Sequence, residues 1–106
     1  MIDIQSFAKM ELIVAQIKDV QEHPDADKLY ILKVDNGKEE KQLVAGIRKA
    51  YTKDELVGKK IIIINNLEPA VIRGQESQGM LLAASSEQGP VLLVPEKDAP
   101  VGAKVK

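Results

Sequence analysis

The chain has 106 residues, of which 44% are hydrophobic and 29% charged, so its length and composition fit one globular domain with one core. It contains no cysteine and one histidine, which excludes a disulfide framework and thiolate metal sites and argues against a histidine-rich metal centre. No apolar run approaches the roughly 18 residues of a membrane span, and the N-terminus lacks the pattern of a signal peptide. We therefore expect a cytoplasmic protein without a membrane partner, with a single domain over residues 1–106.

The net charge of −1 conceals an uneven distribution of charged residues. Residues 28–73 contain ten basic and six acidic side chains, whereas the rest of the chain contains five basic and ten acidic ones. If the fold gathers the basic middle on one face, that face can attract phosphates despite the neutral total. The alternative is a scatter of solvated surface charges, which such runs usually are. Only three residues are aromatic, which disfavours a stacking platform for single-stranded DNA.

The first half of the chain predicts a short helix and three strands. Asp3 can cap a helix that extends to about Met10. Apolar and polar residues then alternate with the period of half-buried strands, over residues 12–20, 29–35 and 38–44. Asn36-Gly37 predicts a tight hairpin between the second and third strands, because both residues tolerate positive φ.

The second half predicts a helix followed by three more strands. Thr52 and Glu55 have the spacing of a capping box, and Gly58 can end the helix that the box begins. Predominantly apolar runs follow, over residues 59–65, 80–84 and 91–94. Short strands joined by turns, with one helix between the third and fourth, favour an all-β fold. We expect a five-stranded Greek-key barrel of the OB type, with one N-terminal helix and one helix between strands three and four. Another small β barrel also fits this pattern.

The segment 65–85, between two apolar strands, contains the best candidates for binding. Arg73 offers a planar set of donors suited to phosphate or a guanine edge. Ser77 and Gln78 offer neutral donors and acceptors that can read base edges or sugar hydroxyls, and Met80 is an adaptable apolar contact. The competing interpretation is a barrel corner with a solvated arginine, a β-bulge at Gly79 and Met80 in the core.

Outside this segment, Lys33 on the polar side of its strand and Arg48-Lys49 after Gly46 are candidates for a basic groove. The turn 23–29 contains one His beside two Asp residues, and we interpret it as structural rather than as a metal or acid–base site. No nucleophile is paired with a base and no glycine-rich phosphate motif opens a helix. We therefore expect no catalytic residue, no metal site and no cofactor.

Several separated motifs now resemble one family. They are His23-Pro24-Asp25-Ala26-Asp27-Lys28-Leu29-Tyr30, Val34-Asp35-Asn36-Gly37, Val44-Ala45-Gly46-Ile47, Asn66-Leu67, Arg73-Gly74 and Ser77-Gln78-Gly79-Met80. They resemble the OB-fold tRNA-binding domain at the C-terminus of methionyl-tRNA synthetases. Free-standing tRNA-binding proteins and the endothelial monocyte-activating polypeptide module share this domain. The resemblance extends over nearly the whole chain.

The resemblance implies structure-directed tRNA binding, homodimerisation and support of a methionyl-tRNA synthetase catalytic subunit. It adds Asn65 and Asn66 to the expected site. The expected tRNA-binding residues are Lys33, Arg48, Lys49, Asn65, Asn66, Arg73, Ser77, Gln78, Met80 and Ser85. The chain departs from the family pattern at Glu68 and Ala70, where basic residues are usual, so we expect fewer phosphate contacts. The rival interpretation is a peptide-binding dimer that resembles a secretion chaperone of the same fold.

Overall fold

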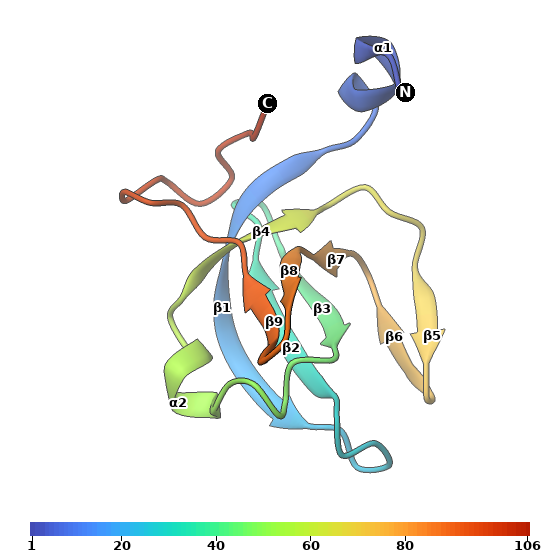
Figure 1. The fold of residues 1–106 in the computed structure, drawn as a ribbon, viewed down its shortest axis with the longest axis vertical. Helices are drawn as coiled ribbons and strands as arrows, with labels where there is room; N and C mark the ends of the chain where they lie inside the picture. The colour runs from blue at the N-terminus through green and yellow to red at the C-terminus, as the bar shows by residue number, and fades with distance from the viewer.

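Five antiparallel strands in the order β3-β2-β1-β4-β7 form the main sheet of the computed structural model, which describes residues 1–106 (Figure 1). The strands are β1 Leu12–Glu22, β2 Tyr30–Asp35, β3 Glu40–Ala45, β4 Lys60–Ile64 and β7 Met80–Leu81. The outer strands β3 and β7 also lie against each other, and the Gln78 N–H before β7 donates to the carbonyl oxygen of Gln42 in β3 (2.7 Å). The sheet therefore curls into a nearly closed barrel, which confirms the predicted OB-type architecture.

The barrel interior is filled by apolar side chains of the predicted strands. Ile17 of β1, Leu32 of β2, Leu43 of β3 and Ile61 of β4 are completely buried. The long strand β1 pairs with β2 over its second half and with β4 over its first half, and a bulge between Ile17 and Asp19 helps it bend between the two. Burial of these β-branched and leucine side chains is the main contribution to the stability of the barrel.

Both predicted helices are present, and a side chain caps each one. Helix α1 (Ile4–Ala8) begins after Asp3, whose carboxylate accepts the Ser6 N–H (2.8 Å). Helix α2 (Lys53–Leu56) lies between β3 and β4 and has the predicted capping box of Thr52 and Glu55. The backbone N–H and the hydroxyl of Thr52 donate to the Glu55 carboxylate and lower its pKa. Helix α1 extends away from the barrel and buries no residue, whereas α2 buries Leu56 (Figure 1).

The predicted hairpin between β2 and β3 is present, but its turn is longer than the predicted Asn36-Gly37 pair. Asp35 pairs with Glu40, so four residues form the turn, and among them only Gly37 has positive φ (96°). The side chain of Asn36 is buried, and its oxygen accepts the N–H groups of Lys38 and Glu39 (both 2.9 Å). Since the side chain satisfies these two backbone donors, the longer turn is stable and Asn36 needs no left-handed conformation.

The segment 65–85 contains more regular structure than predicted. It forms a hairpin of β5 Ala70–Ile72 and β6 Gln75–Ser77, which lies beside the barrel at the right of Figure 1. The predicted strand 80–84 is divided between β7 and β8 Ala83–Ser86, and β8 pairs with β9 Gly89–Leu92 in a separate hairpin. No helix of the structure is both long enough and apolar enough to cross a membrane.

Candidate functional site

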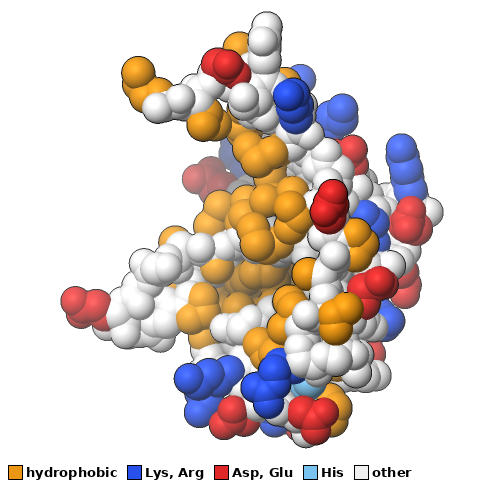
Figure 2. Space-filling model, turned by 90° about the vertical axis from the view of Figure 1, so that its right-hand side faces the viewer, with side chains coloured by type: hydrophobic (Ala, Val, Ile, Leu, Met, Phe, Trp, Pro, Cys, Tyr) orange, Lys and Arg blue, Asp and Glu red, His pale blue; other side chains and the backbone are white.

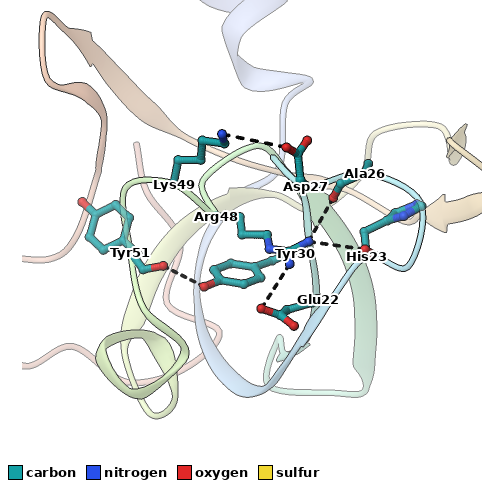
Figure 3. A network of polar contacts seen from close by, with 8 residues as sticks. All are labelled: Glu22, His23, Ala26, Asp27, Tyr30, Arg48, Lys49 and Tyr51. Carbon is teal, nitrogen blue, oxygen red and sulfur yellow. Dashed lines mark hydrogen bonds and ion pairs between the residues drawn. The ribbon is translucent and has the colours of Figure 1, made fainter.

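The turn between β1 and β2 brings together two arginines that are 25 positions apart in the sequence. Arg48 donates from Nη1 to the carbonyl oxygens of Ala26 (3.2 Å) and His23 (3.4 Å), as Figure 3 shows. Arg73, at the tip of the β5–β6 hairpin, donates from Nη2 to the carbonyl oxygen of Asp25 (2.7 Å). The carbonyl oxygens of this turn therefore orient two guanidinium groups at one end of the barrel, which we call the basic end.

The single histidine lies inside this turn. The His23 side chain is buried, and its Nδ1 accepts the Asp25 N–H (3.0 Å). Its Nε2 is buried without a partner. The hydrogen bond folds the turn back on itself, and this geometry agrees with a structural role for His23.

Arg48 and Lys49 are adjacent in sequence but differ in environment. The Arg48 side chain is only 23% exposed and forms an ion pair with Glu22 (3.1 Å), so most of its donors are already used within the protein. The Lys49 side chain is 66% exposed, and its ammonium lies 3.9 Å from the Asp27 carboxylate. Exposed pairs of this length contribute little free energy and exchange readily. Lys49 is therefore free to bind an outside anion, whereas Arg48 mainly holds the turn.

Lys33 and Gln78 both contact Gln42, so strands β2 and β3 and the segment after β6 meet on one face. The Lys33 ammonium donates to the Gln42 side-chain oxygen (2.8 Å), and the Gln42 N–H donates to the Gln78 side-chain oxygen (2.8 Å). The Gln42 amide also donates to the carbonyl oxygen of Glu76 (2.9 Å). Gln42 was not among the predicted residues. A two-residue turn at Asn36-Gly37 would have placed Glu40 opposite Lys33, and only the observed register pairs Lys33 with Gln42.

Ser77 lies inside the closing seam of the barrel. Its side chain accepts the Val44 N–H (3.0 Å) and donates to the carbonyl oxygen of Gly79 (2.9 Å), and the residue is buried. Its hydroxyl therefore holds β3 against the end of β6 and faces away from any ligand on the surface.

Asn65 and Asn66 lie at the other end of β1 from the arginines. Asn66 bonds the backbone of Lys9 and Glu11 (2.7 and 2.8 Å), and Asn65 bonds the side chains of Asn36 and Glu11. A strand of the length of β1 spans roughly 30 Å, so these two amides do not join the basic end. Their hydrogen bonds instead attach the segment before β1 to the end of β4.

Met80 and Ser85 are exposed on β7 and β8. Met80 pairs with Ile64 near the start of β1, whereas Ser85 pairs with Pro90 in the β8–β9 hairpin. Figure 2 shows in orange a hollowed apolar face between the N-terminal helix and the β8–β9 hairpin. The predicted site residues therefore fall into four places: the basic end, the face around Gln42, the start of β1 and the β7–β8 segment.

The basic end and the face around Gln42 offer cations and amides. Exposed Lys28, Lys33, Lys49 and Arg73 lie on these two surfaces, and Figure 2 shows Lys and Arg side chains with Asp and Glu at the lower end of the molecule. No group of three or more His, Cys, Asp or Glu side chains is placed to hold a metal ion. The two carboxyls with clearly lowered pKa values, Asp3 and Glu55, are helix caps. The Ser6 N–H lowers the pKa of Asp3, and Thr52 lowers the pKa of Glu55. The arrangement is suited to binding anions.

Comparison with known proteins gives consistent results. Residues 12–104 match the family model described as "Putative tRNA binding domain". The chain is 52% identical over 105 residues to a methionine–tRNA ligase of Pyrococcus horikoshii and 50% identical to one of Thermococcus onnurineus, covering 99% of this chain in each case. It spans 14% of the length of these relatives.

Solved structures resemble the chain over its whole length. A methionyl-tRNA synthetase-related protein from Pyrococcus horikoshii superposes with a TM-score of 0.92 at 38% identity, covering 100% of this chain and 98% of that one. The chaperone protein CsaA from Picrophilus torridus superposes with a TM-score of 0.93 at 35% identity, covering 100% of both chains.

Proposed function

Since this chain belongs to the family of tRNA-binding domains, we propose that it binds tRNA without catalysing a reaction and thereby supports aminoacylation by methionyl-tRNA synthetase. In this proposal it acts in the cytoplasm, as the C-terminal domain of the enzyme or as a separate subunit beside the catalytic one. Holding the tRNA near the active site raises its effective concentration there. The family match carries this proposal.

The geometry supports a recognition mode based on shape and backbone. Arg73, Lys49 and Lys33 are exposed cations on the surfaces beside the β1–β2 turn and Gln42, and all three were expected site residues. The amide of Gln78 lies beside Lys33 through their shared partner Gln42. The two tyrosines contribute little to stacking. Tyr30 is buried and donates its hydroxyl to the Tyr51 carbonyl oxygen (2.8 Å), and Tyr51 packs against the core while its hydroxyl accepts the Leu92 N–H (3.0 Å). Cations without exposed rings favour contacts to phosphates over stacking on bases.

Titration with unfractionated tRNA at several salt concentrations tests the proposal, with the bound fraction measured by gel shift. We expect a linear fall of log affinity with log salt concentration, with a slope of about −0.7 to −0.9 per phosphate contact. Absence of binding at low salt would contradict the proposal. Because Glu68 and Ala70 stand where basic residues are usual in the family, we expect the salt slope of this protein to be shallower than that of family members with those basic residues.

Arg73→Asn tests the arginine of the hairpin while preserving the hairpin itself. Arg73 has φ of 51° and Gly74 has φ of 85°, so the two-residue turn requires the left-handed conformation at both positions. Asparagine adopts this conformation more readily than arginine, and Asn-Gly is the preferred pair in such a turn. We expect thermal stability to be kept or increased, and the salt slope for tRNA to shrink by about one unit. An unchanged slope would remove Arg73 from the interface.

We also propose that the protein forms a homodimer through its apolar face. A hollow of about 380 Å³ between α1 and the C-terminal segment includes Ile4, Phe7, Met10 and Val105 among its lining residues. Figure 2 shows hydrophobic side chains gathered over a hollowed face, and Val91, Leu93 and Val94 are among the large apolar residues that are exposed. Exposed apolar surface of this kind is typical of an interaction site. Two copies would also present two basic ends to one tRNA.

Sedimentation equilibrium at micromolar concentration tests the dimer, and we expect a mass of twice 11.6 kDa. Ile4 is 76% exposed on α1, so Ile4→Asp should give a folded monomer. Val71→Asp is the matched control, because Val71 is 73% exposed but lies on β5, and we expect it to remain dimeric. A wild-type monomer, or equal effects of the two changes, would contradict the proposed interface.

Peptide binding is the second candidate function, and the similarity to the chaperone CsaA together with the apolar hollow supports it. The same experiments separate the two candidates. A peptide binder would bind an unfolded, reduced model protein through the apolar face and would bind tRNA without a salt slope or not at all.

A further inference from the structure

Three loops of the basic end enclose a small notch that none of the expected site residues except Lys49 touches. Its volume is about 130 Å³, and it lies between the β1–β2 turn, the segment after β3 and the β8–β9 turn. Figure 1 shows the β8–β9 turn beside the chain that leads from β3 to α2. Lys28, Lys49 and Gln88 supply its polar side chains, and no acidic residue lines it.

The backbone around the notch is held in place by hydrogen bonds within the protein. The Arg48 N–H donates to the carbonyl oxygen of Lys28 (3.3 Å), which ties the β1–β2 turn to the segment that bears Lys49. On the other side, the Ser86 hydroxyl donates to the carbonyl oxygen of Gly89 (2.6 Å) and closes the β8–β9 turn next to Gln88. The three donor residues therefore extend from chains whose positions are already set, which lowers the entropy lost on binding.

Small residues leave the space open. Gly46, Ala50 and Gly89 form part of the notch wall, and a Cβ added at Gly89 would lie 3.8 Å from the Cβ of Ala50. Gly89 has φ of 111°, so the turn itself requires glycine there. Larger residues at these positions would fill the notch.

The charges of the notch fit an anionic group whose oxygen atoms accept hydrogen bonds. The two ammonium groups can only donate, the Gln88 amide can turn its NH2 toward a ligand, and no carboxylate in the lining neutralises the two charges. The nearest competitor for Lys49 is Asp27, whose side chain is 83% exposed and whose ion pair is long (3.9 Å). An exposed pair of this kind exchanges readily for a phosphate.

We propose that this notch seats one backbone phosphodiester of bound RNA, with Lys28 and Lys49 as the charged ligands and Gln88 as a neutral donor. The proposal rests on the proposed tRNA-binding function and adds a defined phosphate subsite to it. It also assigns a role to the β8–β9 turn, which lies far along the chain from the other basic candidates.

The experiment measures the salt slope of tRNA binding by the full chain for wild type, Lys28→Gln/Lys49→Gln and Lys18→Gln/Lys97→Gln. We expect the first double variant to reduce the slope by about two units and to weaken binding. The second double variant removes the same charge from two exposed positions that line neither the notch nor the apolar hollow, and it should leave the slope unchanged. Thermal melting checks that both variants are folded.

A variant that keeps the charge of the protein distinguishes a phosphate bound in the notch from general electrostatic attraction of RNA to the lysines. Ala50→Leu places a larger side chain in the notch and keeps both lysines, so we expect it to weaken tRNA binding and reduce the slope by about one unit. If Ala50→Leu is folded and binds like wild type, or if the two double variants weaken binding equally, the notch is not a phosphate site. Absence of tRNA binding by the wild type would instead overturn the proposed function itself.

Discussion

Replacing Gly79 with alanine is expected to lower the free energy of unfolding by about 3 kcal/mol, near the upper end of the usual cost of overpacking. An added Cβ would lie 2.8 Å from the Ile64 carbonyl oxygen and 3.2 Å from the Leu43 side chain. The oxygen belongs to the backbone of β4 and cannot rotate away. The substitution therefore forces β7 apart from β4, where Ile64 pairs with Met80. Urea unfolding followed by circular dichroism measures the effect.

Gly46→Ala is the matched control for Gly79→Ala. An added Cβ at Gly46 meets only the Leu29 side chain, at an ordinary van der Waals distance of 3.8 Å, and Gly46 does not have positive φ. We expect its stability to stay within about 0.5 kcal/mol of wild type. Equal stabilities of the two variants would contradict the claim that the seam between β4 and the start of β7 is tightly packed.

Ser77→Ala is expected to lower the free energy of unfolding by about 2 kcal/mol, because it leaves the N–H of the half-buried Val44 without an acceptor. The carbonyl oxygen of Gly79 also loses the hydroxyl that donates to it. Below the melting transition of the variant, we expect its affinity for tRNA to equal that of wild type. Thermal melting and the tRNA titration measure the two effects separately.

Ser85→Ala provides the comparison for Ser77→Ala. Ser85 is exposed on β8 rather than buried in the barrel seam, so we expect its removal to change the stability by less than about 0.5 kcal/mol. If Ser77→Ala instead kept its stability and lost affinity for tRNA, Ser77 would be a ligand contact and the hydroxyl would have to leave its buried position.

The first strands were predictable because apolar and polar residues alternate along them, and β4 was predictable from its continuous apolar run. Tyr30, Leu32 and Val34 point into the barrel, and the sequence shows this alternation directly. The capping box at Thr52 was predictable for a similar reason, since both of its partners lie within one turn of helix. In these cases the deciding interaction is local or repeats with a short period.

The candidate site was only partly predictable. Arg73 and Lys49 were identified by residue type, and they are exposed at the basic end as a binding role requires. The pairing of β5 with β6 was missed, because its strands have three residues each and Val71 points outward, so no apolar alternation indicates them. In the sequence, Ser77 and Arg48 could not be distinguished from side chains that are free to bind a ligand. In the structure, both form hydrogen bonds within the protein.

The segment from residue 65 to 85 shows most clearly the difference between what the sequence determines and what the tertiary structure decides. The sequence by itself determined that it joins two core strands and carries an arginine, amides and glycines, because those properties belong to single residues and their neighbours. Only the tertiary structure decided which side chains remain available to a ligand. Arg73 reaches the β1–β2 turn and stays exposed, whereas Ser77 is enclosed between β3 and Gly79. Burial and long-range hydrogen bonding depend on strands that lie more than thirty residues away, and no local pattern records them.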